Sequence, residues 1–329
     1  MASTIRDVAR AAGVSVATVS RALNGAENVL PGTKARILAA AAELRFSPSG
    51  AARSLITRRT DTIGAVLPDL HGEYFSELIR GVDQAARQRG LHLLVSSSHG
   101  DAQEAALALR AMHGRVDGLI VMSPHADAQM LSQNLPGGLP AVLLNSGVEL
   151  PGHSNLDVDN RGGALAMTRH LAAQGAQRIA FIGGPADNHE ARERLRGYRE
   201  GLPAGATPLV FEGDFSEDAG REAGKRLAVL PLRPEAVFAA NDMMALGCLG
   251  ALVEAGLRVP EDVLLAGFDD IPIARYVTPQ LTTVRVGIAE LGRRALEGLA
   301  AAIDQAAQAP ERHETIPTEL VIRRSSGSG

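Results

Sequence analysis

The sequence predicts a small all-α head with a helix-turn-helix, followed by an α/β body of two lobes, each built on a parallel sheet. Residues 1–60 contain short helical patterns punctuated by glycine and proline. Between residues 62 and 286, short apolar runs alternate with longer helical patterns, an order typical of parallel α/β structure. The length of 329 residues suits about two ordinary domains and a smaller one.

The head begins with two short helices that meet at a turn. Thr4 followed by Asp7 is typical of a helix start, and Gly13 suits the left-handed residue that ends a first helix. We expect Ser15 to cap the second helix. Two helices joined in this way form the DNA-binding bihelical unit, although an ordinary helical hairpin with a solvated Arg21 has the same pattern.

The start of the second helix is expected to enter a major groove. Val16 and Ala17 would face base edges, where short apolar side chains contact thymine methyl groups, and Arg21 would reach a guanine. Neighbouring polar residues add further contacts. The DNA-binding candidates of the head are Thr4, Ser15, Val16, Ala17, Thr18, Arg21, Asn24 and Lys34.

Charge is distributed unevenly between head and body. Residues 1–60 hold nine basic and three acidic residues, a net charge of +6. Because the whole chain carries −4, residues 61–329 carry −10. A basic head on an acidic body favours nucleic acid as the partner of the head.

A third helix is predicted to start at Pro31. Its apolar stripe of Ile37, Leu38, Ala41 and Leu44 is expected to close a three-helix core.

After Pro48 ends the third helix, residues 49–56 form a short segment that is too brief for a stable helix on its own.

Residues 4–24, with Phe46-Ser47-Pro48 and Ala52-Arg53-Ser54-Leu55, closely resemble the head and hinge of the lac repressor family. The resemblance implies that the hinge segment folds on operator DNA, pairs with a second copy and inserts Leu55 into the minor groove. Such apolar wedges unstack a base step and kink the duplex. Ser49, Arg53 and Leu55 therefore join the DNA-binding candidates, with a linker residue docked on the body as the alternative for Leu55.

In the body, eight apolar runs are expected to be strands. Four precede about residue 150 and four follow it, which favours two similar lobes over one large doubly wound sheet. The expected strands are 63–68, 91–96, 118–122, 141–145, 179–183, 209–212, 236–239 and 263–267, and expected helices include 75–89, 102–112, 162–173, 217–230 and 243–254.

Polar residues follow several of these strands. They include Asp69, Asn145, Asn241-Asp242 and Asp269-Asp270. Ligands of open α/β sheets bind outside the carboxyl ends of the strands. A single residue there is commonly a helix N-cap, which is the interpretation favoured for Asp242 and Asp270. Convergence from both lobes on one cleft favours binding of a polyhydroxylated ligand.

The resemblance to the lac repressor family extends through the body. It is carried by motifs that include Glu73-Tyr74-Phe75, Arg194-Leu195-Arg196-Gly197-Tyr198 and Gly267-Phe268-Asp269-Asp270. The implied effector contacts are Tyr74, Phe75, Asn145, Asp159, Arg194, Phe215, Asn241 and Asp269.

Alternatives remain open at two of these positions. Phe215 either stacks on the ligand or packs in the core, and Arg194 either grips the ligand or serves as a structural ion-pair partner. His189 and Glu190 lie where the family varies, and neither is given a role.

The resemblance also implies the organisation of the chain. One lobe comprises residues 61–159 with 288–316, and the other comprises residues 160–287 with 317–329. Val286-Gly287 departs from the family pattern where the chain crosses between lobes. Ser325–Gly329 lacks the leucine heptad of the family's tetramers, so a homodimer is implied, and its composition predicts a disordered end.

The resemblance therefore predicts a cytoplasmic DNA-binding regulator, a repressor, that binds a pseudo-palindromic operator and responds to a small effector. A sugar is the expected effector, and a purine or nucleoside is the alternative. No cofactor or metal is expected, because Cys248 is the sole cysteine and enzyme motifs are absent. A free sugar-binding protein of the periplasmic type would need a signal peptide and no basic head. The chain shows no apolar run of 18 residues.

Overall fold

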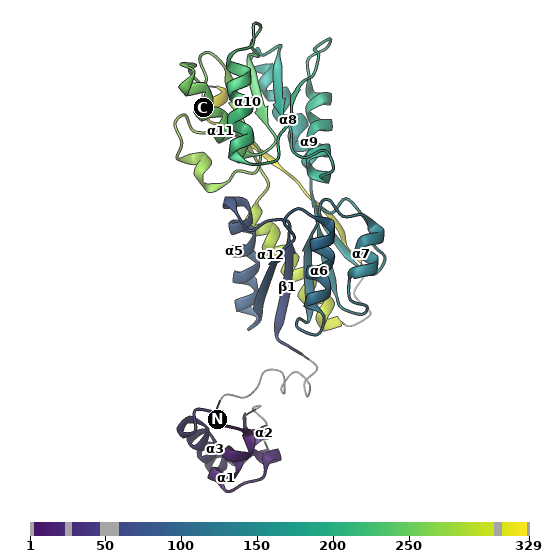
Figure 1. The fold of residues 1–329 in the computed structure, drawn as a ribbon, viewed down its shortest axis with the longest axis vertical. Coiled ribbons are helices and arrows are strands. Elements are labelled where there is room, and N and C mark those ends of the chain that lie inside the picture. Colours follow the sequence, from purple (N-terminus) through teal and green to yellow (C-terminus); the bar gives the residue numbers. More distant parts are fainter. Residues whose placement is uncertain (1–2, 24–27, 47–58, 306–310, 328–329) are drawn as a thin grey trace. The chain divides into compact units, whose positions relative to one another are not determined.

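The computed structural model describes residues 3–23, 28–46, 59–305 and 311–327. It divides into a head, residues 1–60, and a body, residues 61–329 (Figure 1). The predicted fold class is confirmed: the head is all-α and the body is α/β with two parallel sheets. Among the described helices, none is both long enough and apolar enough to cross a membrane.

The head contains three helices around one small core. They are α1 (Ile5–Ala12), α2 (Val16–Leu23) and α3 (Pro31–Glu43). Val8, Val19 and Ile37, one from each helix, are fully buried. The three helices therefore depend on one another, because none is long enough to be stable alone.

The predicted helix-turn-helix is confirmed at its turn. The Asp7 carboxylate accepts a hydrogen bond from the Thr4 backbone N–H at 3.0 Å. Gly13 ends α1 with a φ of 62°. The Ser15 hydroxyl accepts a hydrogen bond from the Thr18 backbone N–H at 3.2 Å and so caps α2.

The expected core stripe of α3 is wrong at Leu38, which is 49% exposed. Ile37 and Ala41 are buried as expected, Leu44 is half-buried, and Ala40 is buried in place of Leu38. Residues three and four apart share one face of a helix, whereas Leu38 is turned by about 100° from Ile37.

The first lobe of the body is built on a six-stranded parallel sheet in the order β11-β5-β4-β3-β1-β2. Alternate residues of its strands enter different cores: Ile120 and Met122 face one, Leu119 and Val121 the other. The strands are β1 (Thr62–Leu67), β2 (His92–Ser97), β3 (Gly118–Met122), β4 (Ala141–Leu144), β5 (Ser154–Val158) and β11 (His313–Ile316).

Four helices accompany this sheet. Helix α5 packs against α12, and α6 packs against α7 (Figure 1). Gly81 permits the close crossing of α5 and α12, because a Cβ there would lie 1.9 Å from the Ala289 carbonyl oxygen. The helices are α5 (Gly72–Gln88), α6 (Ala102–Met112), α7 (Ala128–Asn134) and α12 (Ile288–Gln305).

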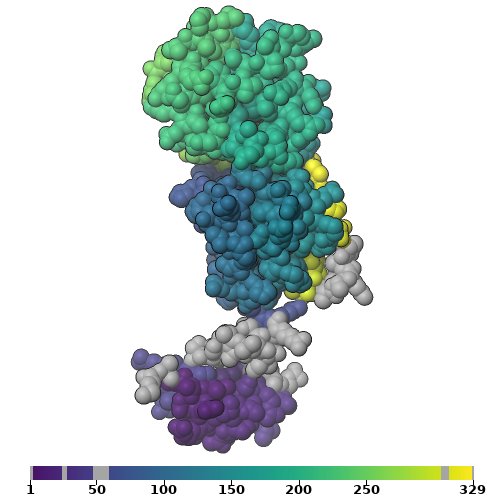
Figure 2. All heavy atoms as spheres, turned by 45° about the vertical axis from the view of Figure 1, so that its right-hand side comes forward, coloured from purple at the N-terminus to yellow at the C-terminus, as the bar shows by residue number. Residues whose placement is uncertain are grey.

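The second lobe repeats this plan with four parallel strands in the order β7-β6-β8-β9. In Figure 2 the two lobes form separate masses that meet at a narrower waist. The elements are β6 (Ile179–Ile182), β7 (Leu209–Phe211), β8 (Ala236–Ala239), β9 (Leu264–Ala266), α8 (Asn160–Ala173), α9 (His189–Gly201), α10 (Glu217–Ala228) and α11 (Asp242–Glu254).

The chain passes between the lobes three times. Strand β5 is followed by α8, β10 (Thr283–Arg285) by α12, and β11 by β12 (Glu319–Val321), which pairs antiparallel with β10. Gly287 lies in the second crossing with a φ of 66°, a conformation that glycine adopts at no steric cost. The residue boundaries expected for the two lobes stay a prediction, which this strand pairing supports.

The expectation of a disordered end is wrong at Ser325 and Ser326. Both residues are fully buried in the short 3₁₀ helix Arg324–Ser326. The Ser325 hydroxyl donates to the Leu265 carbonyl at 2.6 Å and accepts from the Thr282 backbone N–H at 2.8 Å. Small polar residues are favoured here because their hydroxyls satisfy buried backbone groups of the second lobe.

Ser325→Ala is expected to lower the free energy of unfolding by about 1–3 kcal/mol, because it leaves a buried donor and a buried acceptor without a partner. Urea unfolding of the full chain measures this difference. Ser132→Ala, which removes an exposed hydroxyl on α7, is the control. Equal stability of the two variants would show that the Ser325 hydroxyl contributes nothing.

Candidate ligand-binding cleft

A cavity of about 830 Å³ lies between the two lobes of the body. The first lobe contributes the start of α5 and the segments after β2 and β3. The second lobe contributes the starts of α9, α10 and α11 and a residue after β9. The cavity thus lies at the carboxyl ends of strands from both sheets, where open α/β proteins bind ligands.

Arg194 on α9 is the buried cation of this cleft. Its guanidinium donates to the Ala240 carbonyl at 2.6 Å and to the Asn160 side chain at 2.8 Å. It also lies 3.2 Å from an Asp269 carboxylate oxygen and stacks over the Phe268 ring, 3.9 Å from the ring centroid. Most of its hydrogen-bonding capacity therefore serves the protein itself, which supports the ion-pair alternative for Arg194.

Glu190, one helical turn before Arg194, brings a second carboxylate to the same guanidinium. The Glu190 carboxylate lies 3.6 Å from the guanidinium and accepts a hydrogen bond from the Asn145 amide at 2.9 Å. Burial raises the pKa of Glu190 to about 7, and burial also raises the pKa of Asp269 to about 6, in both cases against the attraction of Arg194. Two acids compete for one buried cation.

Tyr74 faces these acids from the first lobe. Its hydroxyl is buried and has no hydrogen-bond partner of standard geometry among the described residues. Burial, followed by the charges of Glu190 and Asp269, raises its pKa well above the ordinary value for tyrosine. The hydroxyl therefore stays protonated and is available to a ligand.

Three of the expected effector contacts have unusual backbone conformations. Asn145, Phe215 and Asp269 have φ values of 45°, 71° and 114°. Left-handed conformations of this kind are costly for residues other than glycine, and they cluster at binding sites.

Of the eight expected effector contacts, six line the cavity: Tyr74, Phe75, Arg194, Phe215, Asn241 and Asp269. The Asn241 amide donates to the Phe215 carbonyl at 2.9 Å, so it also positions that ring.

The other two expected contacts do not line the cavity. The Asn145 amide group bridges the Glu190 carboxylate and the Val158 backbone N–H. The Asp159 carboxylate caps α8 by accepting from the Gly162 backbone N–H at 2.8 Å.

The expectation that Asp242 and Asp270 cap helices is wrong. Asn241 is the N-cap of α11. Asp242 is fully buried and accepts from the Thr283 hydroxyl at 2.6 Å and from the Ile271 backbone N–H at 3.0 Å. Asp270 instead pairs with two arginines, Arg285 at 2.7 Å and Arg323 at 2.5 Å. Both carboxylates fix the loop after β9, which carries Asp269.

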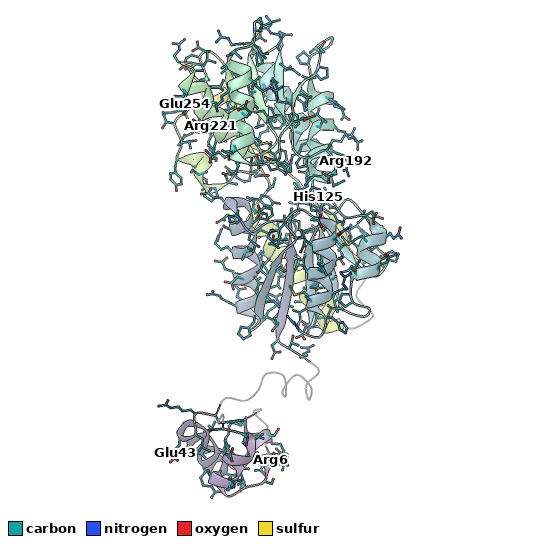
Figure 3. All side chains as sticks on the ribbon, in the orientation of Figure 1. Arg6, Glu43, His125, Arg192, Arg221 and Glu254 are labelled. Atoms are coloured by element: carbon teal, nitrogen blue, oxygen red, sulfur yellow. The ribbon has the colours of Figure 1, made fainter. Side chains whose placement is uncertain are left out.

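Contacts across the cleft hold the two lobes together. The Glu73 carboxylate accepts from the Ile273 backbone N–H at 2.8 Å. His125 lies where the lobes meet (Figure 3), and its Nδ1 is 3.2 Å from an Asp187 carboxylate oxygen without a hydrogen bond of standard geometry. These contacts join the first lobe to the second, so the cleft is bridged at its rim as well as at Glu190 and Asn145.

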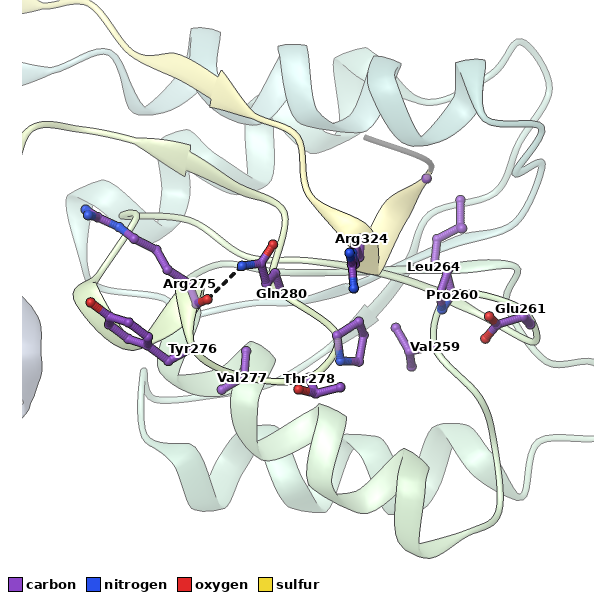
Figure 4. Close-up of a pocket in the computed structure, with 12 residues that line it drawn as sticks. Val259, Pro260, Glu261, Leu264, Arg275, Tyr276, Val277, Thr278, Gln280 and Arg324 are labelled. Carbon is purple, nitrogen blue, oxygen red and sulfur yellow. Dashed lines mark hydrogen bonds between the residues drawn. The ribbon is translucent and has the colours of Figure 1, made fainter.

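A second cavity, of about 780 Å³, lies within the second lobe (Figure 4). Its wall includes Val259, Pro260 and Tyr276, and Gln280 donates to the Arg275 carbonyl at 3.0 Å. The charged residues that line it are exposed, whereas the cleft between the lobes holds buried ones. The interlobe cleft is therefore the stronger ligand site.

The three residues of α2 that are expected to contact bases are exposed. Val16 is 41% exposed, and Ala17 and Arg21 are exposed beside it. The Arg21 Nε donates to the Ala17 carbonyl at 3.3 Å, which holds the arginine along the helix.

The other DNA-binding candidates are hydrogen-bonded, half-buried or outside the described residues. Thr4 and Thr18 hydroxyls are hydrogen-bonded to Asp7 and Ser15, and Lys34 is half-buried at the start of α3. The candidates Asn24, Ser49, Arg53 and Leu55 lie outside the described residues.

Glu190 and His125 are the site residues that sequence reasoning left without a role. For Glu190 a signal was present, since Arg194 follows four residues later and the two share one face of a helix. No such signal exists for His125, which only the packing of the lobes brings to the cleft.

Comparison with known proteins finds relatives that match nearly the whole chain. Residues 4–49 match the family described as bacterial regulatory proteins, lacI family, and residues 168–326 match a periplasmic binding protein-like domain. The chain is 39% identical to the ribose operon repressor of Escherichia coli strain K12 over 98% of this chain and 99% of that protein.

Two solved structures show the same architecture. The lac repressor dimer bound to operator and the anti-inducer ONPF matches with a TM-score of 0.89 and 29% identity, covering 100% of both chains. A LacI family regulator from Enterococcus faecium with bound ribose matches with a TM-score of 0.73 and 25% identity, covering 80% of this chain and 98% of that one.

Glu190→Gln is expected to weaken the pH dependence of stability between about pH 5 and about pH 7.5. Because the pKa of Glu190 is raised on folding, the folded chain retains a proton that the unfolded chain releases, and the free energy of unfolding falls as pH rises through this window. Over this pH window, the free energy of unfolding of the variant should fall by about 1–3 kcal/mol less than that of the parent chain.

Urea unfolding at both pH values tests this expectation. Glu193→Gln, on the same helix but outside the cleft, is the control. A Glu190→Gln chain with the same pH dependence as the parent would contradict the assignment of a raised pKa.

Proposed function

Because the chain belongs to the lacI family of bacterial regulatory proteins, we propose that it binds a pseudo-palindromic operator as a homodimer, acting as a repressor. A small polyhydroxylated ligand between the lobes controls the operator affinity. The observation that carries this proposal is the interlobe cleft, where a buried arginine, two carboxyl groups and a buried tyrosine hydroxyl converge.

The head supports the DNA-binding part of the proposal. Its exposed Val16, Ala17 and Arg21 lie along one helix, and the excess of positive charge is confined to residues 1–60. The short apolar side chains contact thymine methyl groups, and the guanidinium reads guanine. Leu55 acts as the minor-groove wedge between two paired hinge segments. The relative bound to operator is a dimer, which supports the same assembly here.

The geometry of the cleft supports control by the ligand. The cavity has walls from both lobes, so a bound ligand favours one interlobe angle, and that angle sets the spacing of the two hinge segments. The size of this effect is limited by the ligand's differential affinity for the two states. The ribose-bound relative supports a sugar as ligand.

A purine or nucleoside is the second candidate. Phe215 lines the cavity and is half-buried, with its ring centroid 5.8 Å from the Arg194 guanidinium carbon. A ring in this position offers a stacking surface to a flat base as well as to a sugar face.

Arg21→Ala is expected to cost about 1–3 kcal/mol in operator binding and to relax the preference at one base pair. Lys34→Ala, which removes a backbone-contacting charge, should weaken binding to operator and random DNA alike. Fluorescence anisotropy with both DNAs at several salt concentrations separates the two effects. If Arg21→Ala lost the same affinity for operator and for random DNA, the base-reading role of Arg21 would be contradicted.

Asp269→Asn is expected to abolish stabilisation by the effector. A thermal-shift screen of sugars, nucleosides and purines on the full chain identifies a ligand that raises the melting temperature. The variant should lose this rise, because one buried carboxylate acceptor is removed. The exposed Asp218→Asn on α10 serves as the matched control. If calorimetry gives Asp269→Asn the parent's affinity, the site is misplaced.

A further inference from the structure

The cleft holds more buried carboxyl groups than its own cation balances. Glu190 and Asp269 are 8% and 6% exposed in their side chains, and both face the single guanidinium of Arg194. That guanidinium is also engaged by the Asn160 side chain and the Ala240 carbonyl. A buried carboxyl group without full compensation tends to keep its proton, and burial raises the pKa of Glu190 to about 7. A ligand that brings a positive charge favours the ionised form, so this arrangement suits a cationic ligand.

The rest of the cavity wall is also predominantly acidic. Seven acidic residues and one arginine line it, with three histidines. Some of the acids have an ordinary explanation, because Glu73 and Glu217 lie in the first turns of helices, where acidic residues stabilise the helix dipole. Glu190 also lies in a first turn, but its carboxylate is buried in the cavity wall rather than solvated. The acids are Asp69, Glu73, Asp187, Glu190, Asp214, Glu217 and Asp269.

An independent observation points to a ligand at the same place. The Tyr74 hydroxyl is buried and has no hydrogen bond of standard geometry among the described residues, and the polar groups that face it are Asn145, Glu190, Asp269 and Arg194. Buried polar groups are nearly always satisfied in proteins, so an unsatisfied hydroxyl beside two carboxylates indicates a missing polar partner. A ligand ammonium satisfies the carboxylates, and a neighbouring ligand hydroxyl satisfies the tyrosine.

We propose that the effector of this chain is an amino sugar, and that Glu190 is the residue that selects its protonated amino group. The inference rests on the proposed function, because it names the ligand class of the same cleft. Asp269 and Glu190 accept hydrogen bonds from the ammonium, and the remaining hydroxyls lie against Tyr74 and Phe215. Anionic ligands such as sugar phosphates are excluded by repulsion from the surrounding acids.

Calorimetry on the full chain near neutral pH tests this proposal with matched pairs of probes. D-glucosamine, D-galactosamine and D-mannosamine are each compared with the parent neutral sugar, and glucose 6-phosphate supplies the anion. At least one amine should bind about tenfold or more tightly than its parent, because it forms a charge-assisted hydrogen bond in a buried site. Preferred binding of a neutral sugar, a nucleoside or the phosphate overturns the proposal, as does a failure of every amine to bind.

Variants at one position identify the selecting residue. Glu190→Gln should lose most of the preference for the amine over its parent, and Glu190→Asp should keep part of it, since the charge remains. Glu193→Gln, on the same helix but outside the cavity, should keep all of it. A preference that persists in Glu190→Gln rejects the selecting role. A folded state for each variant is verified by its melting temperature.

Operator binding, measured in parallel, separates two kinds of failure. If the chain binds operator specifically and a neutral sugar changes that affinity, the proposed function stands and the amino-sugar inference falls. If the chain shows no preference for an operator over random DNA, the proposed function fails whatever the ligands do.

Discussion

One guanidinium holds the centre of the body together. Arg194 on α9 reaches Asn160 at the start of α8, Ala240 after β8 and Asp269 after β9. A single side chain therefore fixes three segments of the second lobe at the edge that faces the cleft. Removal of its charge would leave Glu190 and Asp269 as uncompensated buried carboxylates, a change that typically costs several kcal/mol.

The first lobe meets this centre through polar contacts at the cleft, in addition to an apolar cluster that includes buried residues of both lobes. Asn145 bridges Glu190 and the backbone of Val158, while Glu73 accepts from the backbone of Ile273. Such contacts are individually weak and can be remade, which suits two lobes that change their relative angle. One cluster of buried apolar residues is shared by the two lobes, and a second lies within the first lobe alone.

The architecture was largely predictable because the sequence patterns that indicate its helices and strands lie within short segments of the chain. Buried parallel strands are apolar runs, so the expected 118–122 and 236–239 coincide with β3 and β8. Strands β5 and β11 escaped prediction because Ser154–Val158 and His313–Ile316 contain polar residues and depend on pairing with each other. Helix α9 was not among the helices named from the sequence, because its many charged residues obscure the pattern of the buried face that includes Tyr198.

The site was less predictable than the fold. Arg194 and Asp269 could be placed because specific motifs flank them, but their ion pair joins residues that are far apart in the chain. Asp159 and Asp242 both come shortly after a strand, yet one caps a helix and the other is buried under the loop of Asp269. Ser325 illustrates the same limit, since a tail of serine and glycine becomes core only when its hydroxyls meet Leu265 and Thr282.

The order in which the sheet of the first lobe is assembled has a consequence for synthesis on the ribosome. Five of its strands, β1 to β5, precede the second lobe in the chain, but α12 and the edge strand β11 follow it. Until β11 emerges, β5 presents an open edge, and unpaired strand edges recruit other chains. The second lobe, whose four strands are contiguous, is nearly complete before the first lobe can close. Both lobes are thus completed only at the end of the chain, because β12 and the 3₁₀ helix Arg324–Ser326 of the second lobe follow β11. The edge of β5 therefore stays unpaired until late in translation.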